Sequence, residues 1–162
     1  MLNIGIVGVG AISQKAYLPV MRSIGNVKWY MCTRNQEVLN RESKLLGRCI
    51  PCNTIEELLQ FPLDGVFIHV STKAHFEVAK QFLEKGIPLY IDKPVAPSYE
   101  KTLELYQLAK KHDTFIMAGF NRRFAPKVEV LKSVEDKKRI IAEKNCTVVS
   151  QDTRTRVFDV FI

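Results

Sequence analysis

The chain opens with an apolar run that ends in a glycine-rich turn. Residues 2–7 (LNIGIV) are mostly apolar, as in a buried strand, and the turn GVG follows at 8–10. Glycine lets the backbone bend sharply and approach another group closely. A helix that starts at Ala11 would add N–H groups with no partner inside the helix. This order of strand, glycine turn and helix start predicts an α/β fold with a binding site for a dinucleotide pyrophosphate.

The turn matches the pattern G-x-G-x-x-G at two of its three glycine positions. Ser13 stands at the third, so the pattern alone is weak evidence, and its place directly after a strand strengthens it. The predicted cofactor contacts of this turn are Gly8, Gly10, Ala11, Ile12 and Ser13.

Strand and helix signals alternate along the chain. Apolar runs predict further strands at 27–32, 48–52, 65–70, 89–91 and 115–119. Helices are predicted at 11–23 (bent or ended by Pro19), at 36–46, from Thr54, at 74–85 and from the cap Ser98 to 112. In the last helix, the residues expected to face the core are Leu103, Tyr106, Leu108 and Ala109. Such alternation predicts a doubly wound parallel sheet of the Rossmann type, covered on both faces.

The pattern changes after residue 120. Residues 1–120 are predicted to form a nucleotide-binding domain, and residues 121–162 to begin a second α/β domain. A helix is predicted from Ala125 to about Val134, and five of the last six residues (VFDVFI) are large and apolar. Such an end needs a partner surface, which favours a domain whose remainder is absent from this chain.

Composition and charge argue against several classes of protein. Apolar residues make up 46% of the 162 residues and charged residues 25%, as in globular proteins. No apolar run reaches the roughly 18 residues of a membrane span, and no signal peptide is recognisable, so a cytoplasmic location is expected. The net charge of +7 keeps nucleic-acid binding as an alternative. Because acidic residues are interspersed among the basic ones, neither nucleic acid nor membrane is the predicted partner.

Two of the four cysteines, Cys49 and Cys52, have the C-x-x-C spacing of a redox pair or of half a zinc site. No second pair and no nearby histidine completes a zinc set. Two reduced cysteines in a short strand are therefore the favoured interpretation, and no metal site is predicted.

Ligands of open α/β sheets bind beyond the carboxyl ends of the strands. The candidate cofactor contacts at these ends are Thr33, Arg34, Ser71, Thr72, His75, Asp92, Lys93, Asn121 and Arg122. His69 is interpreted instead as a core histidine within its strand. His75 opens the next helix and faces the same edge, with or without contact to a ligand.

Arg34 bears on the choice of cofactor. NAD sites usually carry an acidic residue at the end of the second strand, where it binds the ribose hydroxyls. This chain reads CTRN at 32–35, without a carboxylate. The hydroxyl of Thr33 and the guanidinium of Arg34 suit the 2′-phosphate of NADP, and the alternative is a solvated surface arginine. NADP is the predicted cofactor, with NAD possible.

Four motifs together resemble the glucose–fructose oxidoreductase/inositol dehydrogenase family (Gfo/Idh/MocA). The opening IGIVGVGAI resembles the start of that family, and STKAH at 71–75 resembles its T-P-N-x-x-H segment. DKP at 92–94 resembles its E-K-P signature, and GFNRRFAP at 119–126 resembles its G-F-N-R-R-F-x-P segment. The four motifs follow one another in the family's order over about residues 2–126.

The resemblance implies an NAD(P)-dependent oxidoreductase that moves a hydride between a nicotinamide and a sugar- or polyol-like substrate. By this resemblance Lys93 is the catalytic residue and contacts both nicotinamide ribose and substrate. Asp92 would contact the cofactor, and Asn121 and Arg122 would lie near the nicotinamide and the substrate. The Lys93–Pro94 peptide bond is expected to be cis.

The family also continues into a second domain, which supplies most of the substrate pocket, usually a catalytic histidine and often a dimer interface. No histidine follows His112 in this chain. Two functions therefore stay open. One is an enzyme whose full-length form is a possible homo-oligomer, and the other is a non-catalytic dinucleotide-binding sensor or regulatory module.

Overall fold

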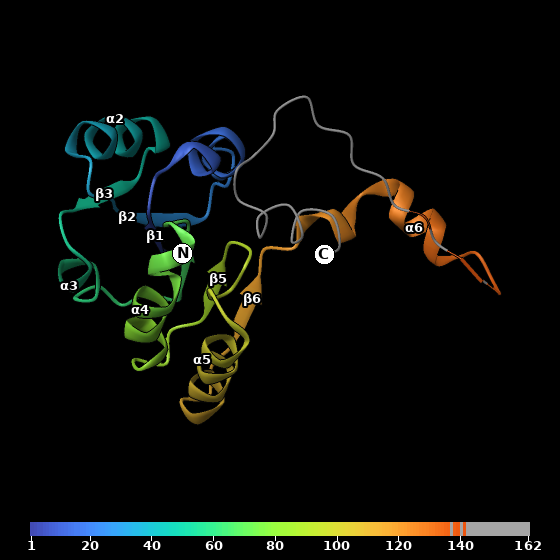
Figure 1. Ribbon diagram of the computed structural model, residues 1–162. Coiled ribbons are helices and arrows are strands. Elements are labelled where there is room, and N and C mark those ends of the chain that lie inside the picture. Colours follow the sequence, from blue (N-terminus) through green and yellow to red (C-terminus); the bar gives the residue numbers. More distant parts are fainter. Residues whose placement is uncertain (137, 140, 142–162) are drawn as a thin grey trace. The chain divides into compact units, whose positions relative to one another are not determined.

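The computed structural model describes residues 1–136, 138, 139 and 141 (Figure 1). Its contacts divide the chain into two compact units, Met1–Ala118 and a second unit that begins at Gly119. The division lies just before the boundary predicted from the sequence. All strands of the described sheet belong to the first unit.

The first unit is built on a six-stranded sheet in which every neighbouring pair is parallel. The strands are β1 (Leu2–Val7), β2 (Val27–Cys32), β3 (Cys49–Cys52), β4 (Gly65–Ile68), β5 (Leu89–Ile91) and β6 (Ile116–Ala118). Their order is β3-β2-β1-β4-β5-β6, with β3 and β6 at the two edges. This order reverses between β1 and β4, as in a doubly wound fold. The predicted fold class is confirmed.

Helices cover both faces of the sheet (Figure 1). The helices on one face are η1 (Ser13–Tyr17), α1 (Leu18–Met21) and α2 (Gln36–Leu46). The helices on the other face are α3 (Ile55–Leu58), α4 (Thr72–Leu83) and α5 (Tyr99–Lys111). Successive side chains of a strand point to opposite faces. Accordingly, Trp29 and Met31 enter one apolar core, and Tyr30 enters the other.

The first helix passes through Pro19 and is widened before it. Residues 11–12 are helical, and η1 is a turn of π-helix. Within η1 and its cap, the N–H of Leu18 bonds the carbonyl of Ser13, five residues earlier. Proline has no N–H and its ring crowds the preceding turn. The wider turn accommodates that ring, so the helix continues to Met21.

Capping residues fix the ends of several helices where the sequence predicts them. Thr54 Oγ1 accepts a hydrogen bond from the N–H of Glu57 (3.1 Å) at the start of α3, and Ser98 Oγ caps α5. Gly47 ends α2 with a φ of 65°, a left-handed conformation that favours glycine.

The structure corrects half of the predicted buried face of α5. Leu103 and Tyr106 are 41% and 42% exposed. Ala109 is buried and Leu108 packs against the core, as predicted, and Leu105 is buried beside them. Residues four apart share one face of a helix, and the pair 105/109 is the one that packs in the core. Because this helix carries apolar residues on more than one face, the sequence alone did not determine which face is buried.

The second unit contains the 3-10 helix η2 (Asn121–Phe124) and helix α6 (Pro126–Lys132). The helix predicted from Ala125 is thus confirmed over a slightly shorter span. The apolar segment at 157–162 lies outside the described residues.

Candidate functional site

A cavity of about 620 Å³ lies at the carboxyl edge of the sheet. Segments that follow β1, β2, β3 and β4 form its walls. The predicted cofactor contacts that line it are Gly8, Gly10, Thr33, Arg34 and Ser71. Its volume is in the range of pockets that hold small ligands and cofactors, roughly 300–1,000 Å³.

The two glycines of the turn have different surroundings. Gly8 has a φ of +88°, and a Cβ there would come within 2.8 Å of the main chain of His69 and Val70. Gly10 lines the cavity, and a Cβ at Gly10 would have no atom within 4 Å. Gly8 is therefore required by the packing of β1 against the β4–α4 connection. Gly10 leaves open space on the cavity side.

The structure places the side chain of Ser13 in the core. It is fully buried, and its Oγ has no hydrogen-bond partner among the described atoms. Only the main chain of Ser13 could therefore serve as the predicted pyrophosphate contact. Its small side chain lets the helix pack closely on the sheet, as the third glycine does in this pattern. Ala11 and Ile12 are exposed in the first helical turn and do not line the cavity.

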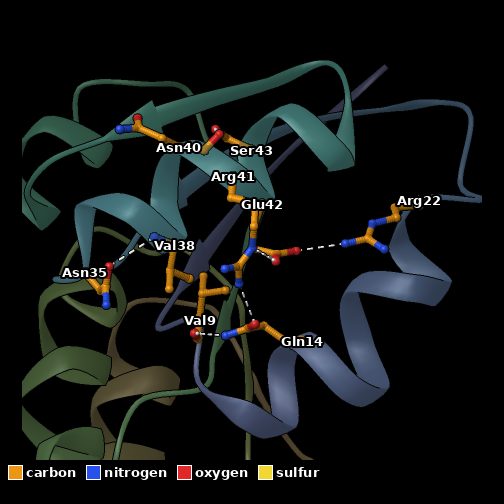
Figure 2. Close-up of polar contacts among 9 residues, drawn as sticks. All are labelled: Val9, Gln14, Arg22, Asn35, Val38, Asn40, Arg41, Glu42 and Ser43. Carbon is orange, nitrogen blue, oxygen red and sulfur yellow. Dashed lines mark hydrogen bonds and ion pairs between the residues drawn. The ribbon is translucent and has the colours of Figure 1, made fainter.

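A chain of polar side chains ties the glycine turn to α2 (Figure 2). Gln14 Nε2 donates to the carbonyl of Val9 (3.0 Å), and Arg41 donates to Gln14 Oε1 (2.9 Å). Arg41 and Arg22 each donate to one carboxylate oxygen of Glu42, at 2.9 and 2.8 Å. Glu42 is only 5% exposed, and the two arginines supply the opposite charges that a buried carboxylate needs.

Thr33 and Arg34 follow β2 directly. Thr33 Oγ1 accepts a hydrogen bond from the N–H of Val9 (3.3 Å), which joins the β2 end to the glycine turn. Asn35 caps α2 by accepting from the N–H of Val38 (3.0 Å; Figure 2). Arg34 is exposed between these two fixed residues and lines the cavity.

The sequence analysis missed one wall of the cavity, formed by the β3–α3 connection. Asn53, Thr54 and Glu56 line it. Glu56 is exposed, and hydrogen bonds from its own N–H and from the Thr54 hydroxyl lower the pKa of its carboxyl. The rule that ligands bind beyond the carboxyl ends of strands could have identified these residues, because the third predicted strand also ends at this edge.

His75 does not line the cavity, although it was predicted to contact a cofactor. Its ring is buried, with Nδ1 2.7 Å from the carbonyl oxygen of Pro94 and Nε2 3.0 Å from that of Val70. The side chain lies within the fold and contacts main-chain carbonyls, and its contact with a cofactor stays a prediction. Thr72 begins α4, is half-buried and also lies outside the cavity lining.

Asp92 and Lys93 follow β5 and do not line the cavity. The Lys93–Pro94 peptide is cis, as predicted. Asp92 Oδ1 accepts from the hydroxyl of Tyr17 (2.7 Å), and its Oδ2 lies 2.9 Å from Nδ1 of His69. Tyr17 also bonds the hydroxyl of Tyr90 (3.0 Å). The predicted burial of His69 is confirmed, one residue beyond β4.

The pKa of Asp92 reflects opposing effects. Burial alone raises the pKa of its carboxyl, but the hydrogen bond and charge of His69, helped by the Tyr17 hydroxyl and the charge of His75, outweigh burial and lower it. Burial and the hydrogen bonds to Tyr90 and Asp92 raise the pKa of Tyr17. Asp92 is therefore a carboxylate that accepts hydrogen bonds, and Tyr17 stays neutral.

The remaining predicted residues lie elsewhere. Asn121 and Arg122 belong to η2 in the second unit, and their roles stay predictions. Cys49 and Cys52 lie in β3, where burial raises the pKa values of their thiols to about 12 and about 11, so both are protonated near neutral pH. Among the described residues, no group of three His, Cys, Asp or Glu side chains could hold a metal ion. No described helix is long and apolar enough to cross a membrane.

Comparisons with known proteins agree with this architecture. YceM of Salmonella typhimurium is 37% identical over 136 residues, which are 82% of this chain and 43% of YceM. An inositol 2-dehydrogenase of Corynebacterium glutamicum is 36% identical over 73 residues, 44% of this chain and 22% of the enzyme. The crystal structure of a Gfo/Idh/MocA family oxidoreductase from Vibrio cholerae superposes with a TM-score of 0.75 at 40% identity, covering 78% of this chain and 40% of that one.

The chain thus spans less than half the length of each of these relatives. A family model described as an oxidoreductase family with an NAD-binding Rossmann fold matches residues 2–120, most of the first unit and of the chain. The glycine turn, the cavity at the carboxyl edge and the turn that carries Lys93 all lie within this match. The chain belongs to the Gfo/Idh/MocA family of oxidoreductases.

Proposed function

We propose that this chain binds NADP(H) at the cavity and forms the cofactor-binding part of an oxidoreductase that acts on a sugar- or polyol-like substrate. The choice of NADP rests on the residues at the end of β2. There Thr33 and Arg34 line the cavity beside Gly8 and Gly10, and residues 32–35 include no carboxylate. A guanidinium matches a phosphate better than it matches ribose hydroxyls.

The residues fit a dinucleotide. Open space at Gly10 leaves room for a pyrophosphate near the first helical turn, whose N–H groups lack partners within the helix. The bonds from Gln14 and to Thr33 hold Val9, so little ordering of this turn is needed on binding. The bound nicotinamide supplies hydride chemistry.

In this proposal Lys93 is the catalytic residue. Its ammonium donates a hydrogen bond to the substrate oxygen and can pass a proton to it. Asn121 and Arg122 are proposed to contact the nicotinamide or the substrate. The inositol dehydrogenase among the relatives supports a polyol-like substrate. Association of the full-length protein into a homo-oligomer belongs to the same proposal.

Glu56 supports a second cofactor. It is an exposed carboxylate that also lines the cavity, and its lowered pKa keeps it charged. A carboxylate can accept hydrogen bonds from ribose hydroxyls and disfavours a phosphate, so Glu56 favours NAD(H). Glu56→Gln and Arg34→Ala therefore have opposite expected effects on the preference between the two cofactors.

Isothermal titration calorimetry of the chain with NADPH and NADH tests the proposal. Wild-type protein should bind NADPH more tightly, and Arg34→Ala should weaken NADPH by roughly tenfold or more with little change for NADH. Lys44→Ala removes the same charge from the exposed surface of α2 and should leave both affinities unchanged. Tighter binding of NADH, lost in Glu56→Gln, would reverse the choice of cofactor. Absence of binding to folded protein would contradict the proposal as a whole.

A further inference from the structure

The turn that carries Lys93 is bonded to the fold on both of its sides. On one side, the Asp92 carboxylate accepts hydrogen bonds from the Tyr17 hydroxyl (2.7 Å) and from Nδ1 of His69 (2.9 Å). On the other side, the Pro94 carbonyl accepts a hydrogen bond from Nδ1 of His75 (2.7 Å). Strand pairing between β4 and β5 ends at Ile68 and Ile91, so these side-chain bonds extend the connection beyond the sheet.

The hydrogen positions follow from what each partner can do. A carboxylate and a carbonyl only accept, so His69 and His75 must both carry a hydrogen on Nδ1. Tyr17 donates its single hydrogen to Asp92 and accepts from Tyr90. His75 Nε2 can bond the Val70 carbonyl as well only when it also carries a hydrogen.

The same histidines join this turn to the cavity wall. His69 lies in the connection between β4 and α4 and lines the cavity together with Val70 and Ser71, and His75 lies in the first turn of α4. The ring of Tyr17 packs on that of His69, with centroids 4.2 Å apart. The side chain of His69 is fully buried, so loss of its bond to Asp92 could not be replaced by water without rearrangement.

We propose that Tyr17, His69 and His75 are positioning residues that hold the Asp92–Pro94 turn against the cavity wall and so fix the orientation of Lys93. The importance of that orientation rests on the proposed function. The geometry itself is independent of any cofactor. An ammonium held within a small range of directions loses less entropy when it meets a substrate oxygen.

NMR of the 162-residue chain tests this without a cofactor. Reductive ¹³C-methylation labels every lysine, and Lys93→Arg identifies the Lys93 signal by its disappearance. His69→Phe keeps an aromatic ring at this position but removes the donor, and Tyr17→Phe removes only the hydroxyl. Both should move the Lys93 signal toward those of exposed lysines such as Lys44. His69→Asn, which restores an N–H near the Nδ1 position, should return it toward the wild-type position.

Tyr30→Phe is the matched control. Tyr30 is a buried tyrosine whose hydroxyl bonds Asn3 (3.3 Å), away from the turn, and its loss should leave the Lys93 signal in place. An unmoved Lys93 signal in folded His69→Phe and Tyr17→Phe would overturn the proposal. So would a wild-type ¹⁵N spectrum with His69 or His75 lacking a hydrogen on Nδ1, a measurement that needs no variant. NADPH titration of the same samples reports separately on the proposed function.

Discussion

Two halves of one sheet edge are built in contrasting ways. Around the cavity, the side chains of Arg34, Glu56 and Ser71 are exposed at the ends of β2, β3 and β4. At the turn after β5, Asp92 and the neighbouring His75 of α4 have a protein partner for each polar side-chain atom. The first arrangement leaves groups available to a ligand, and the second fixes a backbone turn. Substitution of the exposed side chains Arg34, Glu56 and Ser71 should therefore change affinity, and substitution of the buried or fully bonded groups of either half should change stability.

Substitution of the two glycines of the first turn should give the largest difference between an effect on stability and an effect on affinity. Gly8→Ala should lower the free energy of unfolding by about 3 kcal/mol, because it adds a strained φ and a close contact with the β4–α4 main chain. Gly10→Ala should stay within about 0.5 kcal/mol of wild type, yet weaken NADPH binding. Urea denaturation and calorimetry measure the two quantities. Equal losses of stability would break the comparison.

The Glu42 network should give the next largest effect, since it is a buried element on the cavity side. Glu42→Gln removes charged bonds to Arg22 and Arg41 and should cost about 2 kcal/mol. The loss stays moderate because both arginines are partly exposed and can regain water. Glu37→Gln, exposed at the start of the same helix, is the control and should change stability by less than about 0.5 kcal/mol. A smaller loss for Glu42→Gln than for Glu37→Gln would contradict this ranking.

Asp92 should make stability depend on pH. Its pKa is lowered in the folded state, so its contribution is complete above the ordinary aspartate pKa of about 3.9 and is lost as the pH falls through the lower folded value. Asp92→Asn should cost about 1 kcal/mol at pH 7. The difference from wild type should shrink below about pH 4, as followed by urea denaturation at several pH values. A difference that grows on acidification would reverse the assigned sign.

The smallest effect is expected for the cap of α3. Thr54→Ala removes the hydrogen bond to the N–H of Glu57 and should cost roughly 0.5–1 kcal/mol, at the lower end for caps because this helix has four residues. Thr54→Ser keeps the hydroxyl and should restore most of the loss. Thermal unfolding of the three proteins would check this. A cost above about 2 kcal/mol would mean that exposed side chains around the cavity also contribute strongly to stability.

The regular elements could be predicted because their signals are local. β2, α2 and β5 lie where the sequence predicts them, since each is an apolar or amphipathic run bounded by turn or capping residues. The inward turn of His75 could not be predicted, because its partner Pro94 is 19 residues away. The bond between Tyr17 and Asp92 spans 75 positions and depends on a π-helical turn that no simple pattern encodes.

The two edges of the sheet carry a practical consequence. Pro51 interrupts the donors along edge strand β3, and proline on an edge discourages pairing with another molecule. In the described part of the chain, β6 has β5 as its single strand neighbour, and Phe115 and Met117 beside or within it are 62% and 48% exposed. Intermolecular strand addition, and with it aggregation at high protein concentration, should therefore begin at β6. A charged residue at Met117 is the substitution to make first when samples precipitate.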